Sequence, residues 1–174
     1  VKLFKGDEIV SFASEGDEVE VVTEKTPFYG EAGGQVGDQG VIFHEDFSLQ
    51  VEETLRPIED LIVHKGKVKR GKVREGMKAS LKVDPDRRRA ITLNHTGTHL
   101  LQAVLREMLG THVHQAGSLV APDRLRFDFT HFAPVEKKDL EQVEFLVNQK
   151  VRENLKVETK IMPVEDALQL GAMA

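Results

Sequence analysis

The sequence of 174 residues contains no cysteine, no tryptophan and only one tyrosine. The absence of cysteine excludes disulfides, a thiol nucleophile and any metal site that takes a cysteine from this chain. Nine phenylalanines are almost the only aromatic residues, which disfavours a base-stacking platform for single-stranded nucleic acid. No apolar run approaches the ~18 residues of a membrane span, and residues 1–6 contain neither an initiator Met nor a signal-peptide core. These absences favour an internal piece of a larger cytoplasmic protein without a membrane partner.

Basic residues are scarce in the first third of the chain and concentrated just after it. Residues 1–60 carry four basic and 15 acidic side chains, whereas residues 65–89 carry 11 basic and three acidic ones. The net charge of −5 therefore hides a basic segment that is able to contact a polyanion, because phosphate contacts depend on local charge. The alternative is a solvated hairpin edge, on which lysines prevent pairing with other chains.

The first half of the chain has the pattern of a β module. Alternating or apolar runs, separated by Gly, Asp and Glu-Gly, predict strands at the spacing of a small barrel or sandwich. A loop with five glycines among residues 30–40, called the glycine loop below, interrupts them, and we expect it at the surface of the barrel. The predicted strands are residues 19–23, 40–44, 48–52, 61–68 and 77–83.

The pattern changes to helical spacing at Asp84. Asp84 is a suitable N-cap with Pro85 in the first turn, and apolar residues recur at helical spacing up to Leu109, before Gly110. The sequence therefore predicts two modules, a β module over residues 1–83 and an α+β module over residues 84–174. Beyond the first helix, the predicted elements are strands at 111–120 and 124–131, a helix at 136–154, a strand at 156–162 and a short helix at 164–170.

His95 and His99 stand four positions apart on the first predicted helix. This spacing places both imidazoles on one face, with Cβ atoms ~5–6 Å apart, so they are able to share a divalent metal. The alternative is a pair of partly buried histidines that have ordinary hydrogen-bond partners. Thr96 occupies the position at which HExxH zinc peptidases carry their catalytic Glu, so a peptidase would lack its general base.

Three other groups of polar residues allow a site but are also typical of ordinary structure. His112 and His114 share one face of a predicted strand, which is more typical of edge residues than of metal ligands. Residues 115–118 are able to line a small polar pocket, or to form a strand with a bulge. The glycine loop offers backbone N–H groups to a phosphate, but it lacks a P-loop lysine and does not open a helix, which favours a structural loop.

Four motifs follow one another along the chain: TPFYGEAGGQVGD at 26–38, NHTGTHLL at 94–101, QAGSLV at 115–120 and LRFDF at 125–129. In this order they resemble the editing region of alanyl-tRNA synthetase and its free-standing trans-editing relatives. The resemblance implies an α+β fold, in which a small translation-factor-like β-barrel precedes a two-layer editing core, here C-terminally incomplete, with the HxxxH helix. It implies hydrolysis of serine or glycine wrongly esterified to the 3′ end of tRNA(Ala), within an ATP-dependent alanine–tRNA ligase.

The same resemblance assigns roles to individual residues. Thr98 and Gln115 match the residues that read the serine hydroxyl, and they are the expected catalytic residues. Backbone contacts to tRNA are expected from the basic stretch 65–89 and from the glycine loop. The full set of expected substrate-binding residues is Thr98, Gln115, Ser118, Gly33, Gly34 and Gln35.

The resemblance also implies Zn²⁺, held by His95 and His99 together with a Cys and a His from a downstream CxxxH motif. Only two of these four ligands are present, so we expect a chain that stops before that motif, binds zinc partly or not at all, and is inactive or nearly so. The rest of the synthetase is then its expected partner. A non-catalytic tRNA-binding module is the alternative, and it would show salt-dependent tRNA affinity without hydrolysis.

Overall fold

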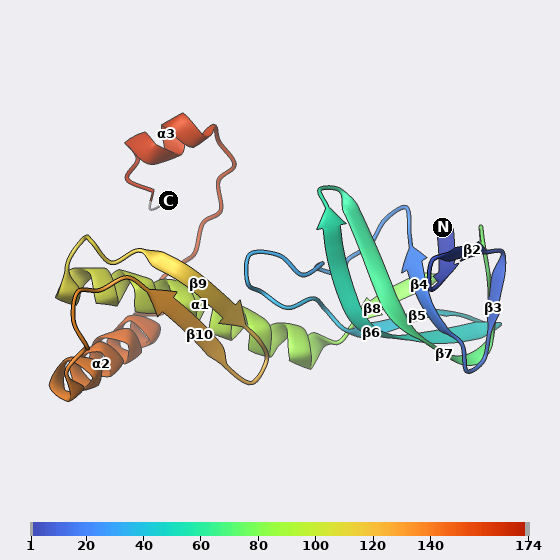
Figure 1. Cartoon of the computed structure of the whole chain (residues 1–174), viewed down its shortest axis with the longest axis horizontal. Helices are drawn as coiled ribbons and strands as arrows, with labels where there is room; N and C mark the ends of the chain where they lie inside the picture. Colours follow the sequence, from blue (N-terminus) through green and yellow to red (C-terminus); the bar gives the residue numbers. More distant parts are fainter. Residues whose placement is uncertain (1, 173–174) are drawn as a thin grey trace.

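The computed structural model describes residues 2–172, which form an antiparallel eight-stranded sheet followed by helices that carry a two-stranded sheet (Figure 1). The two parts lie at opposite ends of an elongated molecule, and the helix α1 leads from one to the other. The elements are β1 (Lys2–Lys5), β2 (Glu8–Val10), β3 (Phe12–Ser14), β4 (Glu18–Val22), β5 (Gly40–His44), β6 (Phe47–Ile58), β7 (Leu61–Arg74), β8 (Ser80–Val83), α1 (Pro85–Leu109), β9 (Gln115–Val120), β10 (Leu125–Phe129), α2 (Lys137–Glu153) and α3 (Val164–Gln169).

The long hairpin β6–β7 is the centre of the first sheet. In its register Leu49 pairs with Val68, and period-two alternation turns both side chains into the core. The strand order is β2-β1-β4-β7-β6-β5-β8, and β3 pairs with the end of β7. Residues from all eight strands pack into one cluster, so the sheet curves around a single core. The pairing path ends at β2 and β8, and closure into a barrel stays a prediction.

The helix α1 has the ends that the sequence predicts. The Asp84 carboxylate accepts hydrogen bonds from the backbone N–H groups of Asp86 and Arg87, each at 3.0 Å, and Pro85 occupies the first turn. At the other end, the Gly110 N–H donates to the carbonyl of Arg106. The hairpin β9–β10 and α2 pack on α1 around a second core of Val104, Leu105, Val113 and Val143.

The structure corrects several expected elements. The three short strands β1 to β3 were not among the predicted runs. The strand expected at 111–120 starts only at Gln115, because the Arg106 guanidinium donates to the carbonyls of Thr111 and Val113 and holds the preceding segment in a turn. Residues 156–162 belong to no strand of the described chain, so that expected strand is wrong.

Among the described residues, no helix has both the length and the apolar character needed to cross a membrane. Residues 1, 173 and 174, at the outer ends of the two expected modules, lie outside the described residues. Strand β8 ends at Val83 and α1 begins at Pro85, which is where the sequence places the change from strands to helix.

A histidine lies inside the first core. His64 is fully buried, its Nδ1 donates to the carbonyl of Val21 at 2.9 Å, and its Nε2 accepts from the hydroxyl of Thr26 at 2.8 Å. The ring meets Phe28 edge-on at 5.2 Å between centroids. Burial lowers the pKa of His64 below its usual value, although the bond to Val21 opposes this, so the ring is neutral in the folded protein.

Acid is expected to destabilise the protein through His64. The pKa of His64 is lower in the folded than in the unfolded chain. Its contribution to the free energy of unfolding is therefore complete above the unfolded pKa of 6.5, and it is lost as the pH falls through the folded pKa. Denaturant unfolding between pH 7.5 and pH 5 measures this loss, and His64→Gln should flatten the pH dependence. His44→Gln, at a partly exposed histidine on β5, is the control, and equal slopes for both variants would contradict the prediction.

Candidate functional site

The two histidines of the HxxxH motif lie side by side on α1. Their ring centroids are 5.0 Å apart and their planes are inclined by 24°, which is the geometry that the i,i+4 spacing predicts. His95 is partly buried, whereas His99 is exposed. Burial first, and the neighbouring His99 second, lower the pKa of His95 below its usual value. His95 is therefore neutral at physiological pH.

His95 also contacts the glycine loop. Its Nδ1 lies 2.5 Å from Oε1 of Gln35, a residue that is 60 positions away in the sequence and only 7% exposed. This contact joins the first sheet to the HxxxH helix. Gln35 was expected to bind substrate, but its carboxamide oxygen is occupied by a histidine of the same chain.

The glycine loop lies directly on β9. The Val36 N–H donates to the carbonyl of Val120 at 3.1 Å, and the Val120 N–H donates to the carbonyl of Gly34 at 2.8 Å. Gly34 is required at this position because a Cβ atom would lie 2.4 Å from Oγ of Ser118 and 2.6 Å from its carbonyl oxygen. Its φ of +81° is also costly for other residues. The close approach of two backbones thus explains part of the glycine motif.

An ion pair between a buried carboxylate and a partly exposed guanidinium fixes the far end of the loop to α1. Asp38 is 1% exposed, and its carboxylate accepts hydrogen bonds from the Arg88 guanidinium and from the Tyr29 N–H. Arg88 also donates to the carbonyl of Pro27 at 2.9 Å. The hydrogen bonds to Asp38 raise the pKa of Arg88 further above its ordinary value. The loop is therefore held on both sides of Gln35.

A polar cavity of about 640 Å³ opens beside the histidine pair. His99 and Gln115 both line it, so the structure brings these two predicted residues together. Gln102 and Arg106 line it as well; they were missed, although they follow His99 at i+3 and i+7 on the same helix face. Of the described residues at its wall, none is acidic. The complete lining is His99, Gln102, Arg106, His114, Gln115, Leu168, Gly171 and Ala172.

The side chain of Gln115 is oriented by its neighbours. Its Nε2 donates to Oγ of Ser118 at 3.1 Å, and that hydroxyl lies 3.5 Å from the carbonyl oxygen of Gly33. These contacts engage the NH₂ group of the Gln115 carboxamide. The carboxamide oxygen of Gln115 is the end that remains for a ligand in the cavity.

The hydroxyl of Thr98 is directed into its own helix. The residue is buried, and its hydroxyl donates to the carbonyl of Asn94 on the preceding turn, at 2.9 Å. The structure therefore places Thr98 on the same helix turn as the two histidines, with its proton directed into the helix.

His95 and His99 are the side chains of this site that were expected to bind a metal. In the described part of the chain, no group of three or more His, Cys, Asp or Glu side chains is arranged to hold a metal. His114 lines the same cavity as His99, but His112 does not. Instead, His112 Nε2 lies 2.9 Å from Nδ1 of His131, and its ring stacks on Phe132.

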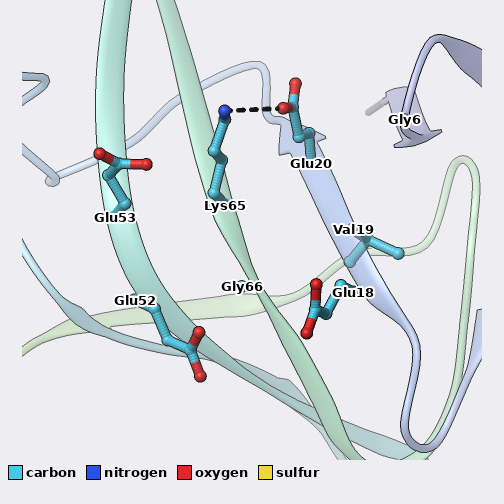
Figure 2. A pocket seen from close by; sticks show the side chains of 8 residues that line it. All are labelled: Gly6, Glu18, Val19, Glu20, Glu52, Glu53, Lys65 and Gly66. Carbon is cyan, nitrogen blue, oxygen red and sulfur yellow. Dashed lines mark ion pairs between the residues drawn. The ribbon is translucent and has the colours of Figure 1, made fainter.

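Three cations of the basic stretch form ion pairs with acidic side chains of the first third of the chain. Figure 2 shows Lys65 on β7 reaching toward Glu20, at 3.1 Å, in a hollow that Glu18, Glu52 and Glu53 also line. Two more cations of the stretch are engaged in the same way, because Lys69 pairs with Glu52 and Arg88 pairs with Asp38. The acidic first third of the sequence thus folds against the basic stretch and offsets part of its charge.

Comparison with known proteins identifies relatives over the whole chain. Residues 1–87, half of the chain, match the family described as class II tRNA synthetases (A). The alanine–tRNA ligase of Chelativorans sp. (strain BNC1) is 54% identical over 172 residues, which cover 99% of this chain and 19% of the relative. Those of Anaeromyxobacter sp. (strain Fw109-5) and Desulfosudis oleivorans are 54% and 46% identical and cover 92% and 99% of this chain. The chain spans about a fifth of the length of these curated relatives.

Proposed function

Because the chain belongs to the class II tRNA synthetase (A) family, we propose that it is the editing region of a cytoplasmic alanine–tRNA ligase. Its reaction is the hydrolysis of the ester that joins serine or glycine, wrongly attached, to the 3′ end of tRNA(Ala). The observation that supports this proposal best is the cavity shared by His99 and Gln115 beside His95. The proposal includes the finer fold, a translation-factor-like barrel over residues 1–83 and an editing core over residues 84–174.

A second site of this kind meets a physical need. A pocket that fits alanine rejects serine poorly, because an added hydroxyl costs a hydrophobic site little, so the wrong product must be removed afterwards. Removal needs a group that recognises the hydroxyl. The carboxamide oxygen of Gln115 is able to accept a hydrogen bond from the serine hydroxyl. The hydrogen bonds from the Gln115 NH₂ group through Ser118 to Gly33 leave that oxygen available. An alanyl ester would leave the oxygen without this partner.

The walls of the cavity suit the end of a tRNA. Phosphates carry negative charge, and phosphate and ribose both offer acceptor oxygens. The described lining of the cavity contains Arg106 and His114 but no carboxylate. Gln102 adds further donors. These side chains hold the nucleotide while Gln115 reads the amino acid.

The two motif histidines fit one half of a zinc site. Nδ1 of His95 contacts Gln35, which leaves the Nε2 lone pair free to bind a metal. The imidazole of His99 lies beside that of His95. Zinc normally takes three or four protein ligands, so this pair supplies part of a shell that other groups complete. When bound, zinc supplies a Lewis acid at the ester.

Replacing Gln115 with Ala in the complete ligase is expected to slow hydrolysis of Ser-tRNA(Ala) about tenfold or more, because one hydrogen bond to the serine hydroxyl is lost. Alanine activation should stay unchanged. Deacylation of purified Ser-tRNA(Ala), followed as release of labelled serine, measures the effect. Gln142→Ala, on the exposed side of α2, is the matched control.

The outcome separates the two functions that the sequence leaves open. Equal deacylation by the Gln115→Ala and Gln142→Ala enzymes would contradict the assigned role of Gln115. Salt-dependent tRNA binding by the complete ligase, with no hydrolysis of Ser-tRNA(Ala) at all, would replace the editing function with a binding module.

A further inference from the structure

The contact between Gln35 and His95 has the features of an orienting hydrogen bond. The carboxamide oxygen lies 2.5 Å from the imidazole Nδ1, and Gln35 is buried. We propose that Gln35 is a positioning residue that holds His95 in one tautomer and one ring orientation. This inference rests on the proposed editing site, but it gives Gln35 a different role from the substrate binding that the resemblance implies.

Hydrogen-bond chemistry defines the tautomer. A carboxamide oxygen only accepts, so the proton of the neutral imidazole must sit on Nδ1 of His95. The other ring nitrogen, Nε2, then keeps its lone pair. An imidazole held in this way is able to serve as a metal ligand or proton acceptor through Nε2, whereas the opposite tautomer presents an N–H there.

The backbone around Gln35 is fixed independently of His95. Gln35 and Ala32 exchange two backbone hydrogen bonds, at 3.0 and 3.2 Å, and the residues on either side of Gln35 bond to Val120. Three residues after Gln35, the ion pair of Asp38 with Arg88 anchors the glycine loop to α1. Because the loop is anchored at these points, the carboxamide imposes an orientation on the imidazole instead of following it.

The position of Gln35 also disfavours direct contact with substrate. The described lining of the cavity includes His99 and Gln115 but not Gln35. With 7% of its surface exposed and its oxygen bonded to His95, Gln35 has little to offer a ligand. Its effect on the site passes through the histidine.

Nuclear magnetic resonance of the metal-free chain tests the tautomer directly. With ¹⁵N-labelled histidine at about pH 8, above the ordinary histidine pKa of ~6.5, long-range ¹H–¹⁵N spectra show which ring nitrogen carries the proton. We expect Nδ1–H at His95. Gln35→Met, which keeps the length but removes the acceptor, should move the proton toward Nε2. Gln35→Glu, which keeps an acceptor, should restore Nδ1–H.

Titration with zinc ions gives a second readout. We expect affinity to fall about 10–100-fold in Gln35→Met and to recover in Gln35→Glu, the size of effect typical of residues that orient a ligand. Gln39→Met, in the same loop but away from the histidines, is the control. The backbone amide signals of Val36 and Val120 verify that the loop still lies on β9 in every variant.

Two results would overturn the proposal. One is a wild-type His95 with its proton on Nε2. The other is a Gln35→Met chain whose glycine loop still lies on β9 and which keeps both the wild-type tautomer and the wild-type zinc affinity. A failure of the editing function would look different, because it would abolish Ser-tRNA(Ala) hydrolysis while these spectra still showed a Gln35-dependent tautomer.

Discussion

Replacing Arg88 with Met is expected to destabilise the protein by about 3–5 kcal/mol, because it leaves a buried carboxylate without its cation. Asp38 is 1% exposed, and with Arg88 removed only the Tyr29 N–H, at 2.6 Å, still donates to its carboxylate among the partners described above. The substitution also removes the bond from Arg88 to the carbonyl of Pro27. Denaturant-induced unfolding at neutral pH measures the change in the free energy of unfolding.

Arg89 provides the matched control for this experiment. It is the next residue on α1 and is exposed, so Arg89→Met should change stability by about 0.5 kcal/mol or less. Combining Arg88→Met with Asp38→Asn should recover part of the loss, since the buried charge is then gone. An Arg88→Met protein as stable as Arg89→Met would show that the pair contributes nothing to folding.

Replacing Gly34 with Ala is expected to cost about 3 kcal/mol or more and to lift the glycine loop from β9. The new Cβ would lie 2.6 Å from the carbonyl oxygen of Ser118, a backbone atom that cannot move without disturbing the hairpin. The left-handed φ of +81° adds to the cost. Because Gln35 follows directly, the contact with His95 should be lost as well.

The adjacent glycine separates the steric effect from the backbone effect. Gly33 also has a positive φ, of +59°, but a Cβ there meets open space. Gly33→Ala should therefore cost only about 1–2 kcal/mol. Unfolding curves of the two variants give the comparison, and equal losses would mean that the close approach to Ser118 is unimportant.

Local patterns in the sequence identify the elements that depend on local physics. Asp84 and Pro85 predict where α1 begins, because capping involves only the first helical turn, and the structure confirms this boundary. The i,i+4 spacing likewise places His95 and His99 on one face. The irregular segment 156–162 shows the limit of this reasoning, since alternation makes a strand only where a neighbouring strand supplies hydrogen bonds.

Contacts between distant polar residues leave no such pattern. Gln35 and Asp38 belong to a loop whose glycines suggest only turns, and nothing in the periodicity of either segment shows that these residues meet His95 and Arg88. The charge of the basic stretch 65–89 is a second case, and its contact with tRNA stays a prediction. Its partners Glu20 and Glu52 lie on neighbouring strands, so its charge can be assessed only when the sheet register is known. The roles of Thr98, Gln115 and Ser118 in hydrolysis stay predictions.

The wide separation of the loop contacts along the chain has a consequence for biosynthesis. Asp38 and Arg88 are 50 positions apart, Gln35 and His95 are 60 apart, and Gly33 and Ser118 are 85 apart. A ribosome that has made the chain up to the end of β8 has supplied every strand of the first sheet, while His95 and β9 do not yet exist. Until then the carboxamide of Gln35 lacks His95 and the carboxylate of Asp38 lacks Arg88. The site is therefore assembled from segments made at different times, and the earlier segment must wait for the later one.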